Sequence, residues 1–273
     1  MTTSVAKTRP TQTAGTITRG TSAAGRLGAL GRAEVTLLVR NRTALSVALF
    51  FPVLMVVVAK STLEEMDLGK VGMNVGEAMV TGGIGMVLLL VVHLNLVSAY
   101  VARREELVLK RLRTGELSDR EILIGTALPA AGLAVAQCAV LMAAGIAFLD
   151  VGAPARPDLL IAGIGAGLVV LTALAAVTAA VTRTVESAQI TTMPMFMLSV
   201  GGSGLLIPLE MMPDTVASVC ELLPMTGITT LVRAGWLGGA DGGDVTTAAV
   251  TALVWAGISV FAVQRWFRWE PRR

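Results

Sequence analysis

Long apolar runs are the feature of this sequence that most constrains its fold. A helix needs about twenty mostly apolar residues to cross the hydrocarbon core of a bilayer. Only 15% of the residues are charged, against roughly a quarter in soluble domains. The sequence therefore predicts an all-α integral membrane protein with six transmembrane helices. We place these spans at about 43–60, 77–100, 125–149, 158–182, 188–206 and 245–263.

The remaining segments are assigned by composition. Residues 1–25 are rich in Thr, Ser, Ala and Gly and predict a disordered tail. Residues 26–42 mix leucine, valine and arginine, which favours a helix lying in the membrane interface. A single transmembrane domain then covers 26–263, and the tail 264–273 carries Trp, Phe and Arg typical of an interfacial anchor.

The region around the fifth span is expected to be irregular. Pro194 and the glycines within 201–204 predict a break in the fifth span. Residues 205–239 are apolar but interrupted by prolines, which predicts short helical pieces that dip into the membrane and return. Such a broken re-entrant segment is tolerated where it packs on protein or lines a cavity.

The lysines and arginines are distributed unequally between the two sides of the predicted membrane domain. With six spans, 18 of the 22 lie on the side that carries both termini, which the positive-inside rule places in the cytoplasm. The excess of Arg over Lys, with abundant Ala, Gly and Val, favours a GC-rich bacterial gene and thus the bacterial cytoplasmic (inner) membrane. Since the basic residues do not form one patch, we predict no nucleic-acid partner.

A densely charged block, residues 103–121, separates the second and third predicted spans. Acidic residues precede basic ones at i,i+4 spacing, which favours a short helix on the membrane surface. Such a helix suits the docking of a soluble partner, although most charge runs are simply solvated. The candidate docking residues are Arg104, Glu105, Glu106, Lys110, Arg111 and Arg113.

His93 is the single histidine and lies within a predicted span, close to Asn95. Ionisable groups inside a membrane are functional candidates, so both residues are candidates for the substrate pathway or its gate. For His93 the alternatives are a helix–helix hydrogen bond, a polar contact in a substrate path, or a proton relay or metal ligand. In the broken segment we predict that Glu210 and Arg233 brace one another as a second candidate gate.

The chain offers no catalytic, metal-binding or nucleotide-binding set. Cys138 and Cys220 are far apart in the sequence, and we predict that both are buried thiols. Gly20 and Gly25 have the spacing of a phosphate-binding loop but lack its Lys and Ser/Thr, which contact phosphate and magnesium. We therefore predict a non-enzymatic chain without a cofactor of its own.

Three segments resemble ABC-2 type exporter permeases, and the daunorubicin-resistance type of drug exporter is the most similar. The charged block is similar to their cytoplasmic loop, although Leu107 stands where the family often has Gly. The other two similarities cover residues 38–51 and residues 203–233, which correspond to the start of the first span and to the connection between the last two.

This resemblance implies a half-transporter that forms a homodimer or heterodimer and pairs with a separate ATPase, which binds ATP and Mg. The charged loop would be the coupling helix received by that ATPase. The expected function is ATP-driven export of a hydrophobic or amphipathic drug, antibiotic or lipid. A non-transporting membrane scaffold and an ion-coupled secondary carrier remain as alternatives, although the latter requires paired acids within the spans.

Overall fold

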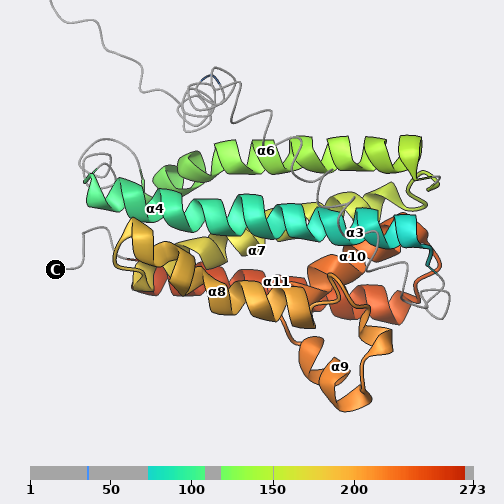
Figure 1. The fold of residues 1–273 in the computed structure, drawn as a ribbon. Coiled ribbons are helices and arrows are strands. Elements are labelled where there is room, and N and C mark those ends of the chain that lie inside the picture. Colours follow the sequence, from blue (N-terminus) through green and yellow to red (C-terminus); the bar gives the residue numbers. More distant parts are fainter. Residues whose placement is uncertain (1–35, 37–72, 108–117, 150, 268–273) are drawn as a thin grey trace, which may run out of the picture.

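A computed structural model describes residue 36 and residues 73–107, 118–149 and 151–267 (Figure 1). Within these ranges the chain forms helices and no strand, which confirms the all-α prediction. The predicted tail 1–25 and the first span lie outside them, and Thr36 alone is described in the predicted interfacial helix. In chain order the elements are α3 (Val75–Val87), η2 (Leu88–Leu94), α4 (Asn95–Glu105), α6 (Asp119–Phe148), α7 (Pro157–Val181), α8 (Val185–Gly202), η3 (Leu209–Met211), α9 (Asp214–Cys220), α10 (Thr226–Leu237) and α11 (Gly242–Trp266).

Local sequence signals set the starts of these helices. Asn74 caps α3 through a reciprocal pair of hydrogen bonds with Glu77, both 2.8 Å long. Ser118 and Glu121 form the same capping box at the start of α6. The α7 helix begins with Pro157, whose missing N–H costs nothing in the first turn. Each of these helices therefore begins where its own sequence satisfies the free backbone donors.

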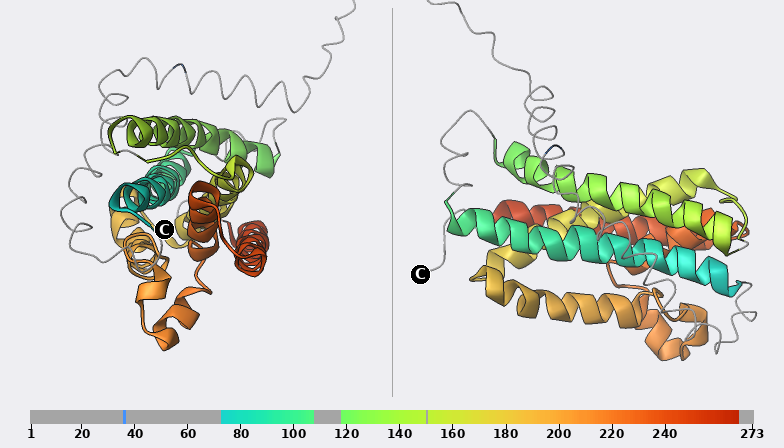
Figure 2. Two further views of the ribbon diagram at one scale, coloured as in Figure 1. Left: turned by 90° about the vertical axis from the view of Figure 1, so that its right-hand side faces the viewer. Right: turned by 45° about the horizontal axis from the view of Figure 1, so that its top comes forward.

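The helices run roughly parallel or antiparallel to a central rod formed by α3, η2 and α4 (Figures 1 and 2). The α6 helix covers one side of this rod, and α7 packs against its η2 and α4 parts. The α7 helix also packs against α10 and α11, which contact one another. The rod and α7 thus form the interior of the bundle, and α6, α8 and α11 lie outside them.

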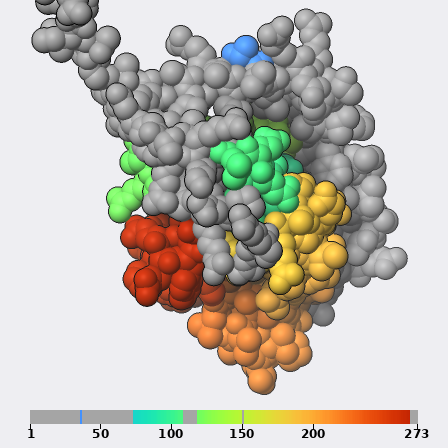
Figure 3. All heavy atoms as spheres, turned by 90° about the vertical axis from the view of Figure 1, so that its left-hand side faces the viewer, coloured from blue at the N-terminus to red at the C-terminus, as the bar shows by residue number. Residues whose placement is uncertain are grey.

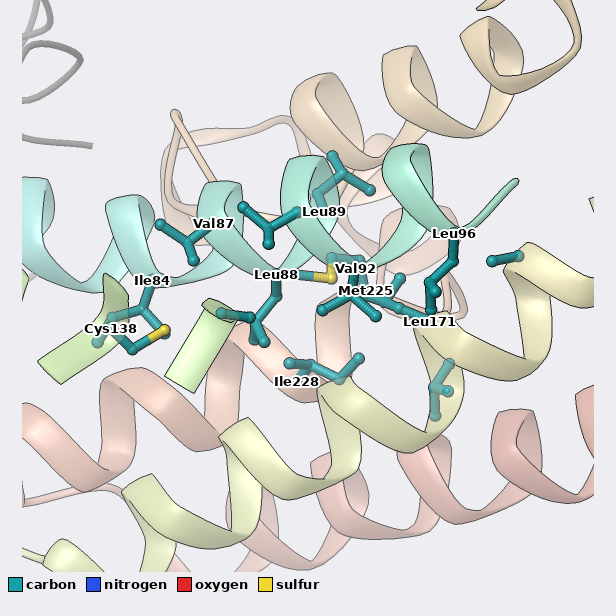
Figure 4. Packing of buried hydrophobic residues seen from close by; sticks show 14 of the residues in the cluster. Ile84, Val87, Leu88, Leu89, Val92, Leu96, Cys138, Leu171, Met225 and Ile228 are labelled. Atoms are coloured by element: carbon teal, nitrogen blue, oxygen red, sulfur yellow. The ribbon is translucent and has the colours of Figure 1, made fainter. Parts of the chain in front are cut away.

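The core between these helices is mainly apolar. Ile84, Leu88 and Val92 project from the central rod and are fully buried. Figure 4 shows them packed with Leu171 of α7 and with residues of α10. Because a membrane-embedded interior offers few partners to polar groups, the buried charged or ionisable side chains are candidates for a specific role.

Glycines bring three helices into backbone contact. A Cβ on Gly235 of α10 would lie 2.4 Å from the backbone nitrogen of Leu160 in α7. A Cβ on Gly227 would lie 2.5 Å from the carbonyl oxygen of Ala248 in α11. Small residues at such crossings allow close helix packing inside membranes. The spacing of α7, α10 and α11 is therefore set by their backbones.

Four helical stretches of the described chain are long and apolar enough to cross a membrane. They are Val75–Glu105, Asp119–Phe148, Pro157–Val181 and Gly242–Trp266. The protein is thus a multi-pass membrane protein. The α8 helix covers most of the fifth predicted span, and its membrane crossing stays a prediction.

The predicted break at Pro194 is wrong. The α8 helix continues through this residue and ends at Gly202, after which Gly204 adopts a φ of 71°. One proline removes a single intrahelical hydrogen bond, and a helix packed among others tolerates that loss. The segment that follows consists of the short helices η3, α9 and α10, and its predicted dip into the membrane stays a prediction.

The charged block does not form one separate helix over 103–121. Its first residues extend α4 to Glu105, and its last residues begin α6 at Asp119. Between them the chain turns at Glu106 and Leu107, and residues 108–117 lie outside the described ranges. Charged residues can end a long apolar helix when their side chains have hydrogen-bond partners, as those of α4 do.

Candidate functional site

One end of the bundle gathers the ends of five helices. The ends of α4, α7 and α11 and the starts of α6 and α8 meet there (Figures 1 and 3). The ends of α4 and α6 carry the described part of the charged block. Among the described residues, the basic ones at this end are Arg103, Arg104, Arg120, Arg183 and Arg265.

Arg104 is buried inside the bundle, whereas its docking role stays a prediction. Its side chain is 1% exposed. It donates hydrogen bonds to the carbonyl oxygens of Ala179 (2.8 Å) and Thr182 (2.6 Å), at the end of α7. Within the bundle, Arg104 connects α4 to the end of α7.

The other predicted docking residues divide into two groups. Glu105 and Glu106 are exposed beside the start of the loop. Lys110, Arg111 and Arg113 lie outside the described residues, so their docking role stays a prediction. Leu107 has a φ of 58°, the left-handed conformation that glycine adopts without strain. The position where the resembled family often has Gly is therefore a helix end that favours Gly.

Two further side chains tie α4 to α6 near the same end. The Tyr100 hydroxyl donates a 3.0 Å hydrogen bond to the carbonyl oxygen of Leu123. The Arg103 guanidinium donates a 3.1 Å hydrogen bond to the Thr126 hydroxyl. Tyr100 was not among the residues predicted from the sequence, although a lone tyrosine near a span end often has a hydroxyl that needs a partner.

His93 lies in η2, a seven-residue stretch of π-helix in the middle of the central rod. Its side chain is 0% exposed, and neither ring nitrogen has a hydrogen-bond partner among the described residues. The ring lies near the backbone of Leu171 in α7 without good hydrogen-bond geometry, so the predicted helix–helix hydrogen bond stays a prediction. Short π-helical segments inside α-helices often occur at functional sites.

Asn95 and His93 do not share a surface. Asn95 is exposed at the start of α4, whereas His93 is enclosed by the core. The structure therefore places the two predicted pathway residues on different faces of the rod. An outward-facing asparagine within a span can form hydrogen bonds with another helix or with a polar group of a substrate.

We expect that replacing His93 with phenylalanine stabilises the protein. The substitution removes at least one buried ring nitrogen without a partner, and such an atom costs about 1–3 kcal/mol to bury. Thermal unfolding in detergent measures the effect. The matched control is Tyr100→Phe, which removes a partnered hydroxyl of the same rod and is expected to lower the stability by about 1 kcal/mol. Equal losses in both variants would contradict this account of His93.

Arg233 of α10 binds a different partner from the predicted one. Its guanidinium donates a hydrogen bond to the carbonyl oxygen of Gly204, in the turn after α8. No direct ion pair joins Arg233 to Glu210, and these two described residues interact only through the electrostatic attraction of their charges. Arg233 therefore holds the chain that follows α8 against α10, at the end of the bundle opposite to Arg104.

The described residues contain no group of three His, Cys, Asp or Glu that could hold a metal ion. Three of their polar side chains, those of Arg104, Tyr100 and Arg233, bind backbone carbonyls of neighbouring segments. Such contacts fix the relative positions of helices. The arrangement is suited to transmitting movement between them.

Comparison with known proteins identifies the type of chain. A family model described as "ABC-2 family transporter protein" matches residues 44–263. No curated protein matches the sequence. The matched range contains every described helix except the last turn of α11.

Proposed function

The chain belongs to the ABC-2 transporter family, and on that premise we propose that it is the permease subunit of an ATP-driven exporter. The family is a membrane transport component that associates with an ABC ATPase. The observation that carries the proposal is the family match over residues 44–263 of the 273. The daunorubicin-resistance subtype rests on the sequence resemblance alone.

We propose that two permease chains assemble with two ATPase subunits, with both termini in the cytoplasm. The basic end of the bundle would then face the ATPase, since the positive-inside rule places the larger number of Lys and Arg there. Nucleotide-driven closure of the ATPase would displace the loop 107–118 and the ends of α4 and α6 on either side of it. The bundle would respond by alternating between states open to the inside and to the outside.

The proposed substrate is hydrophobic or amphipathic, and a drug, an antibiotic or a lipid fits this description. The apolar interior supports the assignment, because the described spans contain few groups that could bind a strongly polar solute. Asn95 and His93 are the proposed polar contacts along or beside the pathway. Glu210 and Arg233 would belong to its outer end.

Reversing two charges of the loop tests the proposed docking. We expect that Lys110→Glu combined with Arg113→Glu abolishes ATP-driven transport, because opposite charges at a docking surface suppress the correct partner. Membrane insertion should not change. The experiment measures uptake of a fluorescent lipid and of a cationic drug into inside-out vesicles, with and without ATP.

The control carries Arg156→Gln, which changes a charge at the opposite end of the bundle. Transport at the wild-type rate by the doubly reversed variant would contradict the docking site. The proposed function itself would be contradicted if the wild-type protein co-purified with no ATPase and showed no ATP-dependent uptake.

A further inference from the structure

The guanidinium of Arg104 holds the end of a helix that is distant in the chain. It reaches Ala179, Thr182 and Arg183, whose carbonyl oxygens lie at 2.8, 2.6 and 3.4 Å. The first belongs to the last turn of α7, and the other two lie in the turn between α7 and α8. One side chain of α4 therefore binds both the end of α7 and the connection to α8.

This contact satisfies a need that α7 cannot meet by itself. The last carbonyls of a helix have no intrahelical donor, and they carry a partial negative charge that favours a nearby cation. The last turn of α7 contains no basic residue. Arg104 supplies the cation from α4, and its planar guanidinium can serve several acceptors at once, which a lysine ammonium does less well.

The same residue lies close to the loop that we propose as the docking site. Leu107, just after α4, has a left-handed backbone conformation. Arg104 lies less than one helical turn before it in the chain. A displacement of the loop therefore reaches Arg104 directly. Tyr100 and Arg103 also link α4 to α6. The α6 helix, however, is connected to the loop directly by the chain, so it does not depend on these contacts to follow the loop. The α7 helix has no such covalent link to the loop.

We propose that Arg104 is the positioning residue that transmits movement of the loop to α7 and to the turn before α8. This inference rests on the proposed function, because it presumes that the loop is moved by an ATPase. The α7 helix packs against α10 and α11, so a displacement passed through Arg104 reaches the far side of the bundle. Figure 3 shows the end of α4 beside the start of α8, where this transmission occurs.

The test compares Arg104→Gln and Arg104→Lys with the wild type in complex with the co-purified ATPase. Three quantities are measured: the ATPase bound per permease, the rate of ATP hydrolysis, and the substrate transported per ATP. For Arg104→Gln we expect bound ATPase and hydrolysis to change little, while transport per ATP falls by about tenfold, within the usual range of coupling between distant sites. Arg104→Lys is expected to recover part of the loss, because it keeps the charge without the planar fork.

The matched control is Arg183→Gln. It removes the same charge from the α7–α8 turn, but its side chain is exposed, and we expect no change in transport per ATP. A second measurement reports the position of the turn. Spin labels at Leu107→Cys and Glu186→Cys, with Cys138 and Cys220 replaced by alanine, should give a narrow distance distribution that Arg104→Gln broadens.

Each outcome decides the inference. Wild-type coupling in Arg104→Gln would overturn it, and so would a parallel loss of assembly and transport in both Arg104 variants, because that result indicates a role in folding alone. An equal loss of coupling in Arg183→Gln would also overturn it, by assigning the effect to net charge. These results differ from a failure of the proposed function, in which the wild type itself shows neither a bound ATPase nor coupled transport.

Discussion

Replacing Gly235 with alanine is expected to prevent normal assembly of the helix bundle. The new Cβ would lie 2.4 Å from the nitrogen, 2.7 Å from the Cα and 2.8 Å from the Cβ of Leu160. Two of these atoms belong to the backbone, so no side-chain rotation relieves the clash and α10 must move away from α7. Overpacking costs about 1–3 kcal/mol, and we expect a value at or above the upper end of this range.

Hydrogen bonds beside this contact add to the expected loss. The N–H of Arg156 donates to the carbonyl oxygen of Gly235 at 2.9 Å, and that of Ala155 donates to Trp236 at 3.1 Å. Separating α10 from α7 breaks both. The measurement is thermal unfolding in detergent, together with the fraction of protein that elutes as a single species on size exclusion.

Two other glycines serve as controls for this prediction. Gly165 in α7 and Gly257 in α11 are also helical, but a Cβ on either would meet nothing within 4 Å. Alanine at these positions is expected to be neutral or to stabilise the helix by up to about 1 kcal/mol. A Gly235→Ala variant that is as stable as Gly165→Ala would show that backbone contact does not set the α7–α10 spacing.

The second large effect is expected from Arg233→Gln. Arg233 is the described residue that binds the carbonyl oxygen of Gly204, and a hydrogen bond to a charged group contributes about 1.5–3 kcal/mol. Its loss should also release the chain between α8 and α9 from α10. We expect a lower unfolding temperature and faster protease cleavage within residues 203–213.

Arg156→Gln is the matched control, because Arg156 lies at the same end of the bundle but pairs with Asp158 on the surface. The two side chains of that pair are 52% and 63% exposed, and such pairs contribute about 0–1 kcal/mol. Glu210→Gln should likewise have a small effect. If Arg233→Gln and Arg156→Gln lower the unfolding temperature equally, Arg233 does not anchor this turn.

The apolar segments could be predicted from the sequence because their length and composition reflect a simple physical requirement. The predicted span 158–182 falls on α7, Pro157–Val181, where proline and an acidic residue mark the start. The predicted span 77–100 falls within the longer helical stretch Val75–Glu105, which continues into the charged block. Arg104 extends the helix into the charged block by placing its guanidinium on the carbonyls of α7, and sequence spacing carries no information about that partner.

Other errors have equally specific causes. Pro194 predicts a break in the helix, but a packed helix tolerates one missing hydrogen bond. The predicted pairing of Glu210 with Arg233 used charge alone, whereas the guanidinium found a backbone carbonyl that the turn at Gly204 presents. The π-helical stretch around His93 has no sequence signature, since it depends on how η2 packs against α6 and α7.

The glycine contacts also limit how this protein can change shape. At Gly235 and Gly227 the backbones of α7, α10 and α11 touch without an intervening layer of side chains. Nothing compressible separates the three helices at these points, so a tilt of one carries the other two with it as a rigid block. The distances across both crossings are therefore expected to be the same in every conformation that the protein adopts during its working cycle.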